Sequence, residues 1–196
     1  SFGAIGTATY KLFKSYGAEV VLLDYNLQKV KEMKLKVKDL CLHCDVTNKN
    51  SVKKAKKELQ GNVVVITGSF GAIGSATYKI FKSYGAEVVL LDNNLQKVRE
   101  MKSKVKDLCL HCDVTNKDSV KKAFKTITET YGGIDILISN AGTAIGGSIA
   151  EVDDKILRQS FEDNFFSHQN CASEAIKIMK KQNIEGCLLF NISKQS

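Results

Sequence analysis

The sequence contains no proline, and no stretch rich in glycine and serine divides its 196 residues. It also lacks an apolar run of about 18 residues, the length that a helix needs to cross a membrane. Its first residues show no basic and apolar signal-peptide pattern. These absences argue against a hinged linker, against membrane spanning and against secretion. We therefore expect a cytoplasmic protein whose six cysteines remain reduced thiols.

Arginine is absent from residues 1–61, where twelve lysines and six acidic residues give a net charge of +6. The rest of the chain contributes only +2 to the total of +8. The lysines fall in stretches of helical pattern, where lysine usually forms a solvated face, and no aromatic residues are interleaved for base stacking. We predict neither nucleic acid nor a membrane as a partner. With 43% hydrophobic and 26% charged residues, the composition is that of a globular protein.

Residues 1–55 recur at 69–123 with an offset of 68, and the two copies differ at only six positions. Such close identity indicates a recent partial duplication, an engineered fusion or an assembly join, because solenoid repeats diverge further and need more units. Only the second copy follows a strand-like run, Val63 to Thr67. We therefore expect one nucleotide site, a domain at 62–196, and a partial duplicate at 1–61 that lacks the first strand. The duplicate could compete for the strands' places or add to a sheet edge.

From residue 62 onward, short apolar runs alternate with amphipathic stretches, which is typical of β-α-β units in a parallel α/β sheet. The apolar runs predict strands at 63–67, 87–92, 108–112, 134–139 and 187–192. The amphipathic stretches predict helices at 72–84, 95–105, 118–131 and 154–181.

A glycine-rich turn joins the first strand of the second copy to a helix, in the order Thr67-Gly68-Ser69-Phe70-Gly71-Ala72-Ile73-Gly74. A phosphate needs exposed backbone N–H groups and gains from the positive end of a helix dipole. Gly68 suits the tight turn, Gly71 a close backbone approach, and Gly74 the packing of the helix. Glycine-rich turns are common, but this strand-turn-helix context favours nucleotide binding. Ser69, Phe70 and Ile73 join the candidate cofactor-binding residues.

The next predicted strand ends at Asp92, followed by Asn93 and Asn94. A carboxylate here can accept hydrogen bonds from the adenosine ribose hydroxyls and would repel a 2′-phosphate. No arginine or lysine follows directly to receive that phosphate, which predicts NAD over NADP. The alternative is a solvated aspartate at the end of a strand.

With three further motifs, the sequence resembles the short-chain dehydrogenase/reductase family. The motifs are Cys112-Asp113-Val114, Asn140-Ala141-Gly142 and Asn164. The resemblance implies that Asp113 and Val114 hold the adenine ring and that Asn140, Ala141 and Gly142 support the sheet beside the nicotinamide ribose. It implies that Asn164 orders a proton-relay water. It also implies a doubly wound parallel sheet of strand order 3-2-1-4-5, truncated after strand five. The turn departs from the family pattern, because Gly71 comes one position early and Ala72 follows it.

The last predicted strand leads into Asn191-Ile192-Ser193-Lys194, where the family commonly has a catalytic serine in fourth place. Ser193 could shift into that role, Lys194 could replace the serine, or both could be a plain strand end. The residue order Asn-x-Ser-Lys-Gln resembles that of a sugar-metabolising branch of the family. In the parent protein the resemblance implies NAD-dependent interconversion of a small alcohol and a carbonyl, and a homo-oligomer.

The family's Tyr-x-x-x-Lys pair would lie beyond Ser196, so we expect this chain to be an inactive fragment. Two other matches, Tyr10 to Lys14 and Tyr78 to Lys82, are interpreted as surface residues of the helix after the glycine turn. Other readings that stay open are a non-catalytic NAD-binding module and a basic interaction protein.

Two Cys-x-x-Cys motifs begin at Cys41 and Cys109, but they are one feature repeated by the duplication. Their separation exceeds that of a zinc ribbon, and each lies in a strand-like segment. We interpret these cysteines and His168 as structural and predict no metal site.

Overall fold

The computed structural model describes residues 22–24, 41–43, 59–144, 148 and 150–191. The chain divides into two compact units, Ser1–Gln60 and Gly61–Ser196. In the first, β1 (Leu22–Asp24) and β2 (Cys41–His43) form a parallel pair with Leu22 opposite Cys41. The repeat-equivalent residues of the second unit, Leu90 and Cys109, are paired in the same register. The two copies, which are nearly identical in sequence, therefore also share the register of this strand pair.

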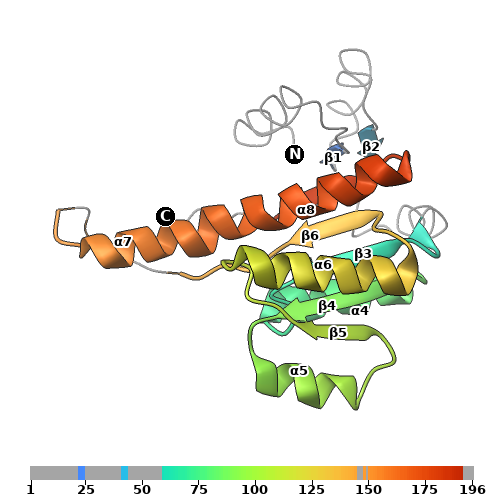
Figure 1. Ribbon diagram of the computed structural model, residues 1–196, viewed down its shortest axis with the longest axis horizontal. Coiled ribbons are helices and arrows are strands. Elements are labelled where there is room, and N and C mark those ends of the chain that lie inside the picture. The colour runs from blue at the N-terminus through green and yellow to red at the C-terminus, as the bar shows by residue number, and fades with distance from the viewer. Residues whose placement is uncertain (1–21, 25–40, 44–58, 145–147, 149, 192–196) are drawn as a thin grey trace. The chain divides into compact units, whose positions relative to one another are not determined.

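The second unit contains five parallel strands (Figure 1), namely β3 (Val63–Thr67), β4 (Glu87–Asp92), β5 (Leu108–His111), β6 (Ile136–Ser139) and β7 (Cys187–Phe190). Their order is β5-β4-β3-β6-β7, which confirms the predicted order 3-2-1-4-5. β5 ends one residue before Cys112, and β6 begins two residues after Ile134. Ile192, the predicted end of the last strand, lies outside the described residues.

Helices connect the strands of this sheet: α4 (Ala72–Ser83), α5 (Leu95–Lys102), α6 (Lys117–Tyr131), α7 (Asp154–Phe161) and α8 (Ser167–Gln182). One long helix was predicted from 154 to 181, and the structure interrupts it with a π-helical turn, η1 (Glu162–Phe166). The prediction missed this turn because Phe161 and Phe165, four residues apart, also fit the spacing of a regular α-helix. Short π-helical turns often occur at functional sites.

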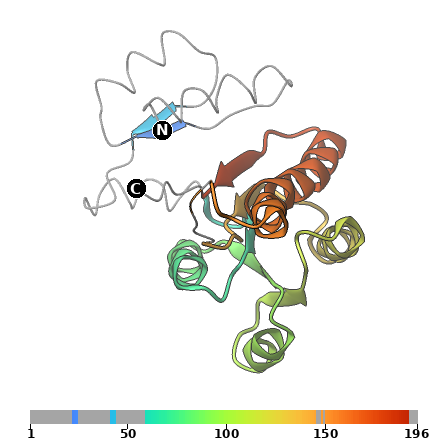
Figure 2. The same ribbon diagram turned by 90° about the vertical axis from the view of Figure 1, so that its left-hand side faces the viewer.

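The alternation of β3 side chains separates two hydrophobic layers. Val63 and Val65 belong to a core that includes Phe124 of α6 and Ala175 of α8. Val64 and Ile66 belong to a second core that includes Val98 of α5, with α4 side chains packed against it. Figure 2 shows helices on both sides of the sheet, which is therefore doubly wound.

Because all five strands are parallel, their carboxyl ends share one edge of the sheet. Thr67, Asp92 and Ser139 stand at the ends of β3, β4 and β6. Each of these polar residues is buried. Ligands of open α/β sheets bind outside this edge, so these strand ends define the region of the site.

Candidate cofactor site

A cleft of about 950 Å³ lies along the carboxyl ends of the strands. Eleven of the predicted site residues line it: Gly68, Phe70, Gly71, Ile73, Asp92, Asp113, Val114, Asn140, Ala141, Gly142 and Asn164. Two others do not line it: Ser69 in the turn and Gly74 in the first turn of α4. Ser193 and Lys194 fall outside the described residues. Most of the candidate residues named from the sequence therefore lie together along this cleft.

The glycine turn is shaped by close backbone contacts. Gly68 has φ +61°, and a Cβ there would lie 2.9 Å from Ala141 Cα. A Cβ on Gly74 would overlap the carbonyl oxygen of Gly68, so Gly74 allows the helix to close on the turn. A Cβ on Gly71 would meet only Gly68 O, at an ordinary 3.5 Å. No described protein atom therefore requires glycine at 71, which leaves its open side for a ligand.

Ser69 faces inward rather than into the cleft. Its hydroxyl lies 2.6 Å from Ile66 O and 3.1 Å from Leu91 O, and its N–H donates to Leu91 O. These contacts tie the turn to β3 and β4. The role of Ser69 in holding a cofactor stays a prediction, and the structure gives its side chain a supporting position.

Asp92 connects the glycine turn to the end of β4. Its Oδ2 accepts a hydrogen bond of 2.9 Å from the N–H of Phe70, and its Oδ1 accepts one of 2.9 Å from the N–H of Asn94. The residue is 8% exposed and lines the cleft. Since each carboxylate oxygen can accept a second hydrogen bond, Asp92 is held in place yet can still receive two hydroxyl groups.

A second aspartate organises the loop after β5. Asp113 Oδ1 accepts hydrogen bonds from Thr115 N at 3.0 Å and Thr115 Oγ1 at 2.7 Å. The N–H of Asp113 donates to Ser119 Oγ, and the N–H of Cys112 donates to Asp92 O. The loop is thereby joined both to α6 and to the end of β4, and it closes one end of the cleft.

Asn140 joins three strand ends at the centre of the cleft. Its N–H and that of Ala141 both donate to Thr67 Oγ1, each at 2.9 Å. Its Nδ2 donates to Thr67 O at 3.0 Å, and its Oδ1 accepts from Asn191 Nδ2 at 2.8 Å. Sequence reasoning placed Asn140 but missed the roles of Thr67 and Asn191. The hydroxyl that ends an otherwise apolar strand was the available signal for Thr67.

Asn164 lies within η1, where the π-helical turn brings it to the end of β6. Its Oδ1 accepts from Thr143 N at 2.9 Å, and its Nδ2 donates to Ser160 Oγ at 3.3 Å. A Cβ on Gly142 would stand 2.7 Å from the same Oδ1, so a larger residue there would displace the Asn164 side chain. Next to it, Asp163 accepts from Thr143 Oγ1 and from Gln159 Nε2, both at 2.8 Å.

His168 lines the cleft as well, which its interpretation as a structural residue did not foresee. Its Nδ1 lies 2.6 Å from Ser139 Oγ, and its ring packs edge-on against Phe190. Burial lowers the pKa of His168 below its ordinary value. The ring is therefore neutral near pH 7.

Lys97 is a further lining residue that sequence reasoning missed. It lies in the first turn of α5, and it is the only lysine or arginine along the cleft among the described residues. Lys97 stands five positions after Asp92, and the prediction of NAD over NADP rested only on the residues that directly follow Asp92.

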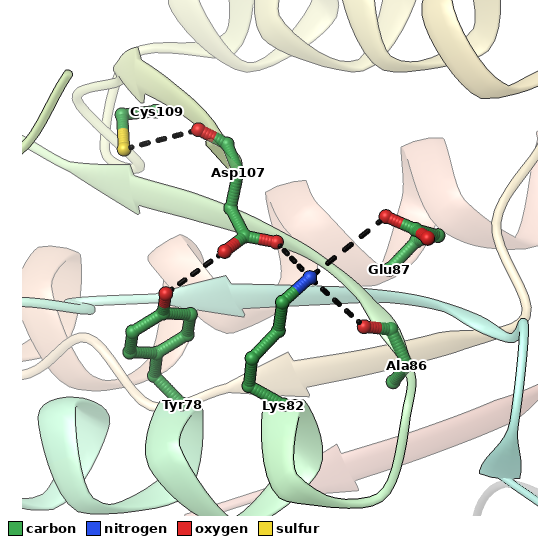
Figure 3. Close-up of polar contacts among 6 residues, drawn as sticks. All are labelled: Tyr78, Lys82, Ala86, Glu87, Asp107 and Cys109. Carbon is green, nitrogen blue, oxygen red and sulfur yellow. Dashed lines mark hydrogen bonds and ion pairs between the residues drawn. The ribbon is translucent and has the colours of Figure 1, made fainter. Parts of the chain in front are cut away.

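Tyr78 and Lys82 do not line the cleft. Both side chains contact Asp107 instead (Figure 3). Tyr78 Oη donates to Asp107 Oδ2 at 2.8 Å, and Lys82 Nζ donates to Asp107 Oδ1 at 2.6 Å. Asp107 directly precedes β5, so the cluster stands at the amino ends of the strands. Burial and the Asp107 carboxylate raise the pKa of Tyr78 to about 12. A general base needs a lowered tyrosine pKa, so this pair has a structural role, although Tyr78 is half-buried and not a surface residue.

The described cysteines of the repeated motif are packed in the core. Cys109 Sγ lies 3.5 Å from Asp107 O, and burial raises the pKa of Cys112 to about 11. Within the described ranges, no three His, Cys, Asp or Glu residues are placed to hold a metal ion. Cys41 and Cys44 belong to the part of the first unit whose side chains are not described. In the same ranges, no helix is long and apolar enough to span a bilayer.

Comparison with known proteins identifies the family of the second unit. The short chain dehydrogenase family model matches residues 62–195. A short chain aldehyde dehydrogenase 1 of Euphorbia lathyris is 33% identical over 146 residues, covering 71% of this chain and 50% of that protein. The chain spans about half the length of the curated relatives it matches.

Two solved structures are similar in fold and sequence. The NADPH-dependent 3-quinuclidinone reductase of Rhodotorula rubra matches with a TM-score of 0.62 at 29% identity, over 69% of this chain and 53% of that one. An aldohexose dehydrogenase of Thermoplasma acidophilum matches with a TM-score of 0.57 at 30% identity, over 63% and 46%. The strand order, the glycine turn and the match over residues 62–195 together show that the chain belongs to the short-chain dehydrogenase/reductase family.

Proposed function

We propose that residues 62–196 bind NAD across the carboxyl ends of the strands, and that residues 1–61 are a partial duplicate without a site of their own. In the whole protein this site interconverts a small alcohol and a carbonyl. The observation that carries the proposal is Asp92. Its buried carboxylate is fixed by two backbone N–H groups and still has acceptor positions toward the cleft.

The residues present fit a nicotinamide dinucleotide. The open side of Gly71 gives room for the pyrophosphate, and the first turn of α4 supplies N–H groups for it, since the first N–H groups of a helix have no partner within it. Asp92 would receive the adenosine ribose, and Asp113 with Val114 would hold the adenine. Asn140, Ala141 and Gly142 would lie beside the nicotinamide ribose. The bound cofactor supplies a carbon that accepts or donates hydride.

The preference for NAD rests on the charge next to the ribose. A 2′-phosphate would approach the Asp92 carboxylate, and like charges in a partly buried site repel strongly. Lys97 opposes this preference because it brings a positive charge to the same cleft. We propose that Asp92 dominates, because it is buried and held by two hydrogen bonds whereas Lys97 is exposed.

In the chemistry, Asn164 takes the relay position, and Ser193 or Lys194 takes the position of the catalytic serine. A sugar-derived substrate is supported by the polar groups at that end of the cleft, namely Thr143, Gln159 and Asp163. A homo-oligomer is supported by exposed aromatic side chains on α7 and η1, among them Phe161 and Phe165. We place the protein in the cytoplasm.

The test is a fluorescence titration of the chain with NADH and with NADPH. We expect NADH to bind more tightly than NADPH, with the difference reduced in Asp92→Ala and increased in Lys97→Ala. Equal affinity of the wild-type chain for both cofactors would refute the preference. Failure to bind either would refute the proposed function.

A further inference from the structure

Asn170 is a buried polar residue of α8 that does not line the cleft. It is 5% exposed, and its Nδ2 donates to Val114 O at 3.1 Å and to Thr115 O at 3.3 Å. Its Oδ1 is buried and has no hydrogen-bond partner among the described residues. The amide is therefore held entirely through its donor end, by two carbonyls of the loop after β5.

That loop forms the cleft wall on which Asp113 stands. Asp113, Val114 and Thr115 all line the cleft, and Thr115 donates two hydrogen bonds to Asp113 Oδ1. Because Asn170 holds the carbonyls of Val114 and Thr115, the peptide units on both sides of Thr115 are fixed. The position of the Asp113 carboxylate consequently depends on an amide that never touches the ligand.

The same helical segment also reaches the opposite end of the cleft. Asn164 in η1 accepts from the N–H of Thr143, and His168 in α8 contacts Ser139 at the end of β6. One continuous helical segment thus contacts the loop after β5 and the turn after β6. Since helices are stiff, this arrangement sets the spacing between the two ends of the site.

We propose that Asn170 is a positioning residue for the adenine half of the cofactor. It holds the 113–115 loop at a fixed distance from the nicotinamide end, and its loss lowers affinity for the adenylate part alone. A leucine of similar size would pack in its place without the orphaned Oδ1, so core packing alone does not account for an amide here. The inference rests on the proposed nucleotide function of the cleft.

The experiment measures binding of AMP and of nicotinamide mononucleotide by NMR titration of the full chain. Asn170→Leu removes the donor at similar volume. Met179→Ala is the control, because Met179 is also buried on α8, nine residues further along, and lines no part of the cleft. We expect Asn170→Leu to bind AMP about tenfold more weakly, equivalent to about 1.4 kcal/mol. Its affinity for nicotinamide mononucleotide should match that of the wild type, and Met179→Ala should bind both ligands normally.

Unchanged AMP affinity in a folded Asn170→Leu chain, or an equal loss for both ligands, would overturn the proposal. If this variant does not fold, the side-chain amide resonances of Asn170 in the wild-type chain decide. They should shift with AMP and not with nicotinamide mononucleotide, and the absence of that difference counts against the inference. A wild-type chain that binds neither ligand would instead remove the proposed function on which the inference depends.

Discussion

Thr67 offers a quantitative test of how the site is built. Its buried Oγ1 accepts hydrogen bonds from the N–H groups of Asn140 and Ala141, both at 2.9 Å. Thr67→Val replaces this oxygen by a methyl group of similar size, and the two N–H groups lose their acceptor. An unsatisfied buried donor costs about 1–3 kcal/mol. Because Asn140 and Ala141 are half-buried, we take the low end for each and expect a loss of about 2 kcal/mol in unfolding free energy.

The assay is urea unfolding followed by circular dichroism, with NADH titration of the same samples. Thr67→Ser is the control, because it keeps the oxygen and loses only a methyl group, which costs about 0.8 kcal/mol. We expect Thr67→Val to bind NADH several-fold more weakly and Thr67→Ser to bind it normally. Thr67→Val with wild-type stability and wild-type affinity would refute the assignment of Thr67 as the acceptor that joins β3 to β6.

Three other outcomes follow from the described contacts. Gly74→Ala should destabilise the chain by about 1–3 kcal/mol in urea unfolding, since its Cβ meets a backbone oxygen. Gly71→Ala should instead keep wild-type stability and lose NADH affinity. The opposite pattern would show that the open side of Gly71 is not the side on which the ligand binds. The pKa of Tyr78 should be about 12 by ultraviolet difference spectroscopy, so its contribution to stability is present below pH 10 and lost as pH rises toward 12. Asp107→Asn should lower that pKa. A Tyr78 pKa of 10 would contradict the hydrogen bond to Asp107. Burial lowers the folded-state pKa of His168, so the stability of the wild-type chain should decline as pH falls below about 6.5. The decline should be less steep in His168→Asn, as measured by urea midpoints at several pH values. Identical pH profiles for the two chains would place His168 in solvent.

The parts of the fold that sequence predicted are those governed by local pattern. The strand at β3, the turn at Gly68 and the acid at Asp92 each follow from apolar runs and residue types within a short window. The strand order came from the resemblance to a family, because no local pattern encodes which strands are neighbours. The same register in β1–β2 and β4–β5 follows from the repeated sequence.

The parts that sequence missed depend on contacts between distant residues. Thr67 meets Asn140 across 73 positions, and Asn191 meets Asn140 across 51. The inward rotation of the Ser69 hydroxyl depends on Leu91, and the role of Tyr78 depends on Asp107. Lys97 enters the cleft because α5 begins there. Such contacts arise only when the sheet is assembled, so residue type and spacing could not reveal them.

The duplication provides the most direct test of the central claim that the chain holds one nucleotide site, in the second copy. Asp24 is the repeat equivalent of Asp92, so the two substitutions Asp24→Ala and Asp92→Ala form a matched pair within one chain. Calorimetric titration of the wild type with NADH should give one site per chain. Asp92→Ala should weaken that binding at least about tenfold, consistent with the loss of hydrogen bonds to a charged group, and Asp24→Ala should leave it unchanged. Two sites per chain, or equal losses from the two substitutions, would contradict the account.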